Sequence, residues 1–180
     1  MNGGIGSFIS EEALLLHSEY LKSLKLRYSV MEKSYPEVKN TSIGRNFKMR
    51  GFRYKDEAVE LRAEIICHEL FFDSFGNAYQ ASRAVREAYR TESSFIYEVF
   101  KLCSEGKGKF AVISTDRGTV NIKELYEARE ILKIPSAVLC IDLCEHSYFL
   151  DYGFDKERYI SNLLPYLNLG VLDKILDDKH

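Results

Sequence analysis

Three of the four histidines fall where the sequence predicts buried structure. His17 lies among leucines on one expected helix, and His68 lies on a second helix that is apolar on more than one side. His146 follows four residues after Asp142, which ends the most apolar predicted strand. A lone histidine on an apolar face is usually an ordinary core residue. An unpaired buried carboxylate is costly, however, and one iron, manganese or zinc ion would satisfy all four side chains and leave a position for solvent.

Two long helices are expected to carry the first two histidines. Ser10 before two glutamates is typical of a helix start, and apolar residues recur at helical spacing until Pro36. Residues 37–54 are basic, contain glycines and are predicted to form a long loop. A second helix is expected from Asp56 to about Phe72. These helices would form an N-terminal helical hairpin.

The second half of the chain alternates helical and strand patterns. Helices are predicted at about 79–90, 93–104, 155–166 and 168–177, and strands at 109–114, 119–122 and 137–141. Residues 123–132 fit either a helix or a structured loop. We therefore predict an α+β fold in which helices surround a three-stranded antiparallel sheet. The expected domains are residues 1–76 and 77–180, with the metal bound between them.

Composition narrows the class of protein. The 180 residues are 46% hydrophobic and 29% charged, which is ordinary for a globular chain. The net charge of −2 gives no reason to expect a nucleic-acid or anionic-membrane partner. No apolar run approaches the roughly 20 residues of a membrane helix, and no secretory leader is recognisable. Four cysteines without a CxxC pair then predict reduced thiols and a cytoplasmic location.

The segment around the last candidate ligand resembles a family signature. Asp142–Tyr152 reads D-L-C-E-H-S-Y-F-L-D-Y and is similar to the D-x-W-E-H-A-Y-Y-x-D-Y of iron/manganese superoxide dismutases. Weaker similarity to that family covers most of the chain, at Ile9–Glu12, Ala63–Phe72, Gly106–Gly108 and Tyr152–Ile160. The resemblance implies that one iron or manganese ion converts superoxide to dioxygen and hydrogen peroxide.

Carried over residue by residue, the resemblance makes His17 the axial ligand and His68, Asp142 and His146 the equatorial ligands. The family holds the metal-bound solvent with a glutamine, and Glu64 stands at its helical position, which favours iron over manganese. Glu64 would act on that solvent either ionised or protonated, or would instead turn away into an ion pair with Arg62 or another basic residue.

Other departures surround this expected metal site. Lys25 occupies the position of the family's gate tyrosine, and Tyr20 and Tyr28 on either side of it are the possible substitutes. The sequence has 12 Tyr and 11 Phe but no Trp, so every tryptophan of the family pattern is replaced. Cys144 takes one of those positions, either as a filler or close to the metal. The predicted catalytic residues are Glu64, Lys25 and Tyr28.

The resemblance also implies a homodimer. In family dimers the glutamate of the E-H pair reaches the ligand histidine of the other subunit, and both residues are present here as Glu145 and His146. The expected interface residues are Glu145, Tyr148, Phe149 and Leu21. Because fold does not establish function, the alternative is a metal-binding protein on this fold with altered or lost dismutase activity, as a sensor or structural protein.

Overall fold

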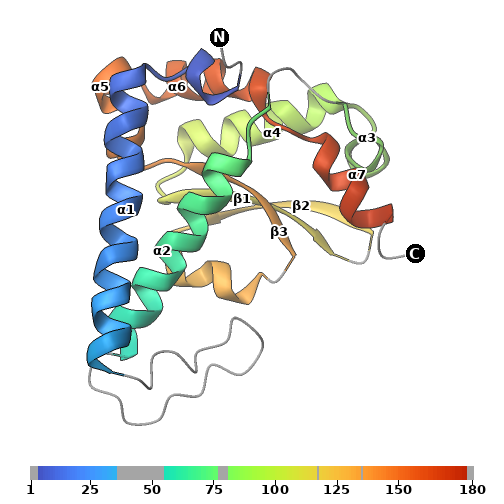
Figure 1. Ribbon diagram of the computed structural model, residues 1–180. Helices are drawn as coiled ribbons and strands as arrows, with labels where there is room; N and C mark the ends of the chain where they lie inside the picture. Colours follow the sequence, from blue (N-terminus) through green and yellow to red (C-terminus); the bar gives the residue numbers. More distant parts are fainter. Residues whose placement is uncertain (1–3, 36–54, 77–80, 117, 135, 178–180) are drawn as a thin grey trace.

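The computed structural model describes residues 4–35, 55–76, 81–116, 118–134 and 136–177 (Figure 1). Helix α1 spans Glu11–Ser34, and the Ser10 hydroxyl caps it by accepting a hydrogen bond from the Ala13 amide at 3.1 Å. Helix α2 spans Lys55–Asp73. Both predicted N-terminal helices are therefore present. The predicted loop at 37–54 lies outside the described residues.

Helices α1 and α2 pack against each other along their apolar faces (Figure 1). Their shared cluster, which we call the hairpin core, consists of Leu24, Tyr28, Ala58, Leu61 and Ile65. The Lys25 ammonium and the Glu69 carboxylate form an ion pair across the two helices at 2.8 Å. This packing sets the register of α1 against α2, and with it the relative positions of His17 and His68.

The elements after α2 follow the predicted order. A short helix at Phe149–Tyr152 was not predicted, the helix predicted at about 155–166 ends at Leu163 and continues as a 3₁₀ helix, and there are two further differences. The helices are α3 (Arg83–Tyr89), α4 (Glu92–Glu105), α5 (Phe149–Tyr152), α6 (Lys156–Leu163) and α7 (Gly170–Asp177). The strands are β1 (Phe110–Asp116), β2 (Thr119–Leu125) and β3 (Ala137–Asp142). Short 3₁₀ helices are η1 (Ile5–Ser7), η3 (Ala128–Lys133), η4 (Glu145–Ser147) and η5 (Leu164–Tyr166).

The first difference concerns residues 123–132, which are neither one helix nor one loop. Lys123 and Leu125 continue β2 because they pair with Val112 and Phe110 of β1, and η3 begins only at Ala128. The hydrogen-bonded pairing with β1 here overrides the preference of the local sequence for a helix or a loop. The second difference is that α3 starts at Arg83, four residues later than predicted.

The sheet has the strand order β2-β1-β3, and all pairs are antiparallel. Alternate residues of the central strand β1 enter different clusters: Ala111 and Ile113 join the larger core, and Phe110 and Val112 join the cluster that α2 and η3 cover. Helices on both faces therefore bury this strand from Phe110 to Thr115, and only its last residue, Asp116, is exposed. An α+β fold with an N-terminal helical pair and a three-stranded antiparallel sheet is confirmed.

The end of α2 is tied to the second half of the chain. The Cys140 amide donates a hydrogen bond to the Ser74 hydroxyl at 2.7 Å, and Phe75 forms an antiparallel bridge with Leu167. The larger core also joins Phe8 and Phe71 to residues of α4 and α6. The division into two domains at residue 76 thus stays a prediction, and the larger core contains residues from both sides of that position.

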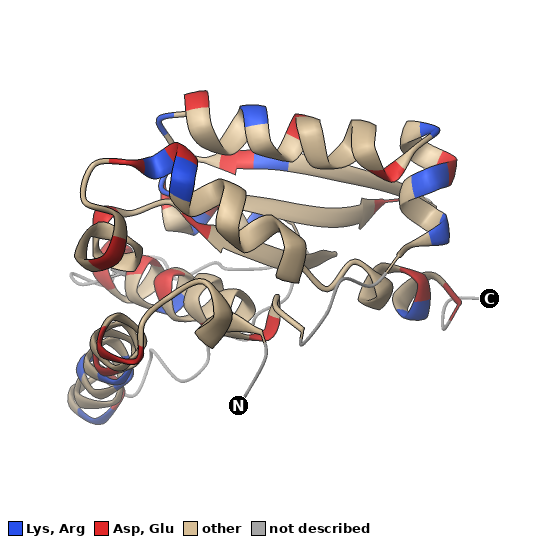
Figure 2. Cartoon of the chain, turned by 90° about the horizontal axis from the view of Figure 1, so that it is seen from above, with Lys and Arg blue, Asp and Glu red and all other residues tan. Residues whose placement is uncertain are grey.

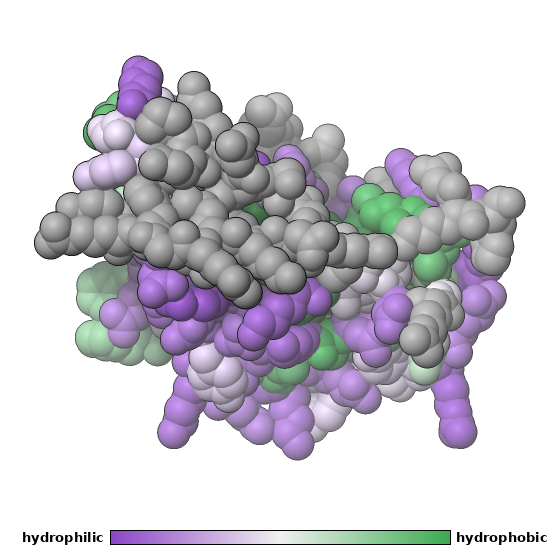
Figure 3. Space-filling view, turned by 90° about the horizontal axis from the view of Figure 1, so that it is seen from below, coloured by the Kyte–Doolittle hydropathy of each residue, from purple (hydrophilic) through white to green (hydrophobic). Residues whose placement is uncertain are grey.

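The visible surface is polar and carries charges of both signs. Acidic and basic residues are interspersed along the outer faces of the helices (Figure 2). Seen from below, hydrophilic side chains predominate where no grey atoms lie, and hydrophobic ones form separate groups (Figure 3). Among the described residues, no helix is long and apolar enough to cross a membrane.

A carboxylate from α7 caps the start of α3. Asp173 accepts hydrogen bonds from the Ser82 hydroxyl and from the Arg83 and Ala84 amides, each at 2.9 Å. Burial opposes ionisation of Asp173, but these donors outweigh burial and lower its pKa. The contact joins two segments that are about 90 residues apart in sequence.

We predict that Asp173→Asn lowers the free energy of unfolding at pH 7 by about 1 kcal/mol, because it removes a charged helix cap. Since folding lowers the pKa of Asp173 below its ordinary 3.8, this advantage is complete above that value and is lost as the pH falls through the folded pKa. Urea unfolding at pH 7 and pH 3 measures it. Asp177→Asn, which removes only an exposed ion pair with Arg83, is the control. An equal loss at both pH values would contradict the prediction.

Candidate metal centre

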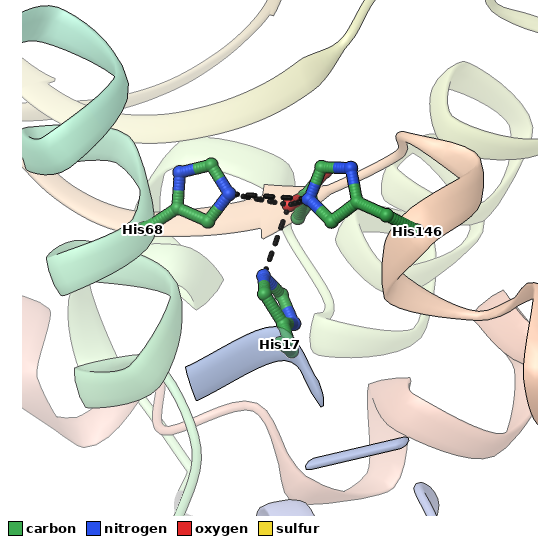
Figure 4. A group of neighbouring side chains, drawn as sticks. His17, His68 and His146 are labelled. Atoms are coloured by element: carbon green, nitrogen blue, oxygen red, sulfur yellow. Dashed lines mark hydrogen bonds and ion pairs between the residues drawn. The ribbon is translucent and has the colours of Figure 1, made fainter. Parts of the chain in front are cut away.

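Four side chains from four elements meet at the end of β3. His17 comes from α1, His68 from α2, Asp142 from β3 and His146 from η4. One potential ligand atom of each lies within 4.8 Å of the others. The three imidazoles point toward a single carboxylate oxygen (Figure 4). The structure thus brings together all four residues that the sequence predicted as ligands.

The separations between these atoms match the edges of a coordination polyhedron. Asp142 Oδ2 lies 3.3 Å from His17 Nε2, 3.3 Å from His68 Nε2 and 3.1 Å from His146 Nε2. The Nε2 atoms of His68 and His146 are 3.2 Å apart. Donors that bind one ion at about 2.1 Å and subtend 90–110° lie roughly 3.0–3.4 Å apart. One small transition-metal ion therefore fits among the four side chains.

Unsatisfied polar atoms in the centre support the same fit. Asp142 Oδ2 and both ring nitrogens of His17 are buried without a hydrogen-bond partner among the described residues. Buried polar atoms normally have a partner, because leaving one unpaired costs about 1–3 kcal/mol. An ion bound to Oδ2 and Nε2 would satisfy two of these three atoms. Nothing in the described structure accounts for Nδ1 of His17.

Neighbouring groups orient the candidate ligands. The Cys144 amide donates to Asp142 Oδ1 at 2.9 Å, which leaves Oδ2 to face the imidazoles. Nδ1 of His68 lies 2.7 Å from the backbone oxygen of Glu64, so Nδ1 carries the proton and Nε2 presents its lone pair to the centre. The buried Tyr159 hydroxyl donates to the Asp142 backbone oxygen at 3.1 Å. These contacts prepare the donor atoms before any ion arrives.

The pKa values of the buried residues in the centre depend on their burial and on the negative charge of Asp142, which the histidines face. Burial lowers the pKa of His17, and the Asp142 carboxylate only partly offsets it. Burial also tends to lower the pKa of His68, but the interactions of its ring with the Asp142 carboxylate outweigh burial. The pKa of His68 is therefore raised. Burial alone would raise the pKa of Asp142, yet the imidazoles of His146, His17 and His68, which face its carboxylate, hold that pKa well below its usual range. The carboxylate therefore stays ionised and offers a negative charge to a cation.

Aromatic rings enclose the centre on its inner side. The His17 ring packs on Phe71 and Phe72, with centroids 4.8 and 5.1 Å away. Phe110 meets the His68 ring edge-on at 5.6 Å. Residues Phe71 and Phe110 were not predicted as part of the site, because their patterns identify them only as core residues. Phenylalanine thus supplies much of the wall in a chain without tryptophan.

Of the two tyrosines considered as gate substitutes, Tyr20 lies at the centre. Its ring centroid is 4.6 Å from that of His146 and 5.2 Å from that of His68, and its hydroxyl donates to Glu64 Oε2 at 3.4 Å. Burial and then the Glu64 charge raise the pKa of Tyr20 to about 12, so the phenol keeps its proton at neutral pH.

The other predicted catalytic residues lie at different distances from the centre. Glu64 is half-buried on α2, one turn before His68, and faces Tyr20 rather than forming the expected alternative pair with Arg62. Arg62 instead lies over the ring of Tyr28, 5.8 Å from its centroid. Tyr28 belongs to the hairpin core, about 16 Å along α1 from His17. Lys25 is exposed and paired with Glu69.

The residues predicted for a dimer interface divide into two pairs. Glu145 is exposed, and the Phe149 side chain is also largely exposed. Tyr148 is buried in the larger core, where its ring stacks on Tyr159 at 5.0 Å, and Leu21 packs on the hairpin core. The structure thus places Tyr148 and Leu21 in intramolecular packing.

Comparison with known proteins agrees with the fold. The family model described as "Iron/manganese superoxide dismutases, C-terminal domain" matches residues 69–174, which is more than half of the chain. The chain therefore belongs to the iron/manganese superoxide dismutase family. It is 26% identical over 125 residues to "Superoxide dismutase [Fe]" of Babesia bovis. That match covers 64% of this chain and 63% of the relative, so the chain spans less than two thirds of the relative's length.

We predict that Asp142→Asn weakens binding of Fe²⁺ or Mn²⁺ at least about tenfold, because it removes the only carboxylate of the donor set. Metal analysis of the purified chain after loading and dialysis measures the bound ion. Glu69→Gln, which neutralises an exposed carboxylate beside His68, is the matched control and should retain the ion. Equal metal content in the two variants is the contrary result.

Proposed function

We propose that this protein is a superoxide dismutase that uses one iron or manganese ion held by His17, His68, Asp142 and His146. The single observation that carries the proposal is the 3.1–3.3 Å spacing of the donor atoms around Asp142 Oδ2. Family membership through residues 69–174 supports it. When bound, an iron or manganese ion would supply one-electron redox chemistry, through which an electron passes from one superoxide to a second.

The protein's own residues would contribute position, charge and exclusion of water. Asp142 brings a negative charge that three neutral imidazoles do not cancel, and this favours the trivalent form of an ion. The Cys144 amide and the Glu64 backbone oxygen fix the orientation of Asp142 and His68. Phe71, Phe72 and Phe110 exclude water from the inner side. Substrate would therefore approach from the side where His146 is exposed.

Glu64 is the proposed partner of the metal-bound solvent, and its place on α2 favours iron. Its carboxylate is half-buried and lies on the same face of α2 as His68, four residues away. An ionised glutamate accepts a hydrogen bond where a glutamine would donate one. The iron preference also agrees with the printed name of the Babesia bovis relative. Lys25 is proposed to act on the approach of the superoxide anion from its exposed position on α1.

We further propose that two copies associate around the exposed side of the centre. Phe149, Leu150 and Phe154 are 48%, 51% and 86% exposed, and the rings of Phe149 and Phe154 pack edge-to-face at 5.1 Å. Exposed aromatic clusters of this kind are typical of protein interfaces. Glu145 and His146 lie in the same segment. The four free cysteines agree with a cytoplasmic location, which stays a proposal.

The activity test compares metal content and superoxide removal in one sample. Full-length protein reconstituted separately with Fe²⁺ and Mn²⁺ is expected to accelerate superoxide decay in proportion to bound metal, and His17→Ala should abolish that rate. Chelation should remove the activity, and the matching ion should restore it. Bound metal without any acceleration would overturn the dismutase proposal. It would favour a metal-binding protein with altered chemistry, which the carboxylate at position 64 and the thiol at position 144 would suit.

The association test uses two exposed aromatic residues. Phe149→Glu places like charges opposite each other in a two-fold interface and should weaken dimerisation at least about tenfold. Sedimentation equilibrium over a concentration series measures the dissociation constant. Tyr97→Glu is the control, since Tyr97 is 65% exposed on α4, away from η4. A monomeric wild-type protein, or a dimer that only Tyr97→Glu dissociates, would refute this interface.

A further inference from the structure

We propose that Ser147 is a positioning residue for His17, and that its hydroxyl accepts a hydrogen bond from Nδ1–H of that histidine. The inference rests on the proposed metal site and adds a residue that holds one of its ligands. Ser147 directly follows His146, at a position where the family signature D-x-W-E-H-A-Y-Y-x-D-Y has alanine. The hydroxyl is therefore a departure of this chain from the family pattern.

The second nitrogen of His17 needs an acceptor once Nε2 binds an ion. A neutral imidazole that binds a metal through Nε2 carries its proton on Nδ1. Ligand histidines nearly always donate that proton to a nearby oxygen, which fixes the tautomer and the direction of the ring. His68 follows this rule, because its Nδ1 lies 2.7 Å from the backbone oxygen of Glu64. His17 turns Nε2 toward the carboxylate (Figure 4), and its buried Nδ1 has no partner among the described residues.

Another unpartnered polar atom lies in the turn beside His17. Ser147 is 1% exposed, and its hydroxyl oxygen is buried without a partner in the described part of the chain. The turn η4, which contains Ser147, packs against α1, and the ring of His146 meets that of His17 edge-on at 5.2 Å. Of the six unpartnered buried side-chain atoms among the described residues, four belong to His17, Asp142 and Ser147. The unsatisfied atoms thus gather at the metal centre.

The two atoms are chemically complementary. Nδ1–H of a metal-bound imidazole can only donate, and the oxygen of a serine hydroxyl can accept. No direct bond joins them in the structure, so a rotation of the Ser147 side chain or one buried water makes the link. Buried waters commonly bind polar atoms that would otherwise be unsatisfied. The His17 ring is then held with Nε2 directed at the ion, which strengthens metal binding.

The test uses the full chain loaded with Co²⁺, which shifts the NMR signals of ligand protons away from the other signals. Contacts with the Phe71 ring assign the Nδ1 proton of His17, which we expect to exchange slowly with solvent. In Ser147→Ala this proton should exchange at least about tenfold faster, whereas the Nδ1 proton of His68 should not change. The affinity for Co²⁺ should fall about tenfold, as expected when a ligand histidine loses its hydrogen-bond partner.

Two further variants separate positioning of His17 from general stability. Ser147→Thr keeps a hydroxyl and should retain both the slow exchange and the wild-type affinity for Co²⁺. Thr115→Val removes another buried hydroxyl that has no partner among the described residues, near the end of β1 remote from Phe110, and should change neither quantity. Circular dichroism establishes that each variant is folded. If Ser147→Ala does not fold, the exchange rate of the wild-type His17 proton decides.

Unchanged proton exchange and Co²⁺ affinity in Ser147→Ala would overturn the role of Ser147. So would an equal loss of affinity in Thr115→Val, or fast exchange of the His17 proton in the wild type. A chain that binds no Co²⁺ would overturn the inference together with the metal site. Superoxide removal is measured separately on the iron-loaded chain. Lost removal with the Ser147→Ala effects intact rejects the dismutase proposal alone, and normal removal without those effects rejects the role of Ser147 alone.

Discussion

The structure depends on how one fully buried carboxylate is compensated. Asp142 has no exposed surface, and an unpaired charge in such a place would cost several kcal/mol. Three imidazoles from α1, α2 and η4 surround one of its oxygens, and a backbone amide binds the other. The helical pair, the sheet and the turn after β3 must all be in place before these groups meet. The arrangement of the site therefore depends on the packing of all these elements.

The sheet and the helical pair each fix part of this arrangement. Antiparallel pairing sets Asp142 opposite Phe110, whose ring packs against His68. The Ser74 hydroxyl binds the Cys140 amide and holds the end of α2 against β3. Phe71 belongs to the larger core and also contacts His17. The same side chain thus belongs to the core and positions a candidate ligand.

The surroundings of the centre differ from those of the family pattern in a physically consistent way. The apolar wall consists of phenylalanines in a chain that has no tryptophan, and the predicted correspondence puts the carboxylate of Glu64 where the family has an amide. A tyrosine from a different turn of α1 faces that carboxylate and keeps its own proton. The four candidate ligands are brought together, while the side chains around them depart from the family pattern.

The sequence by itself predicted the four candidate ligands that the structure brings together, the Ser10 helix start, the α+β class and most element positions, because these follow from local periodicity, capping and a signature segment. Only the tertiary structure decided that Tyr20 rather than Tyr28 meets the imidazoles, and that Tyr148 and Leu21 pack internally. It also decided that residues up to Leu125 join β2. Each of these outcomes depends on the register between elements distant in sequence, which side-chain packing sets and local pattern does not encode.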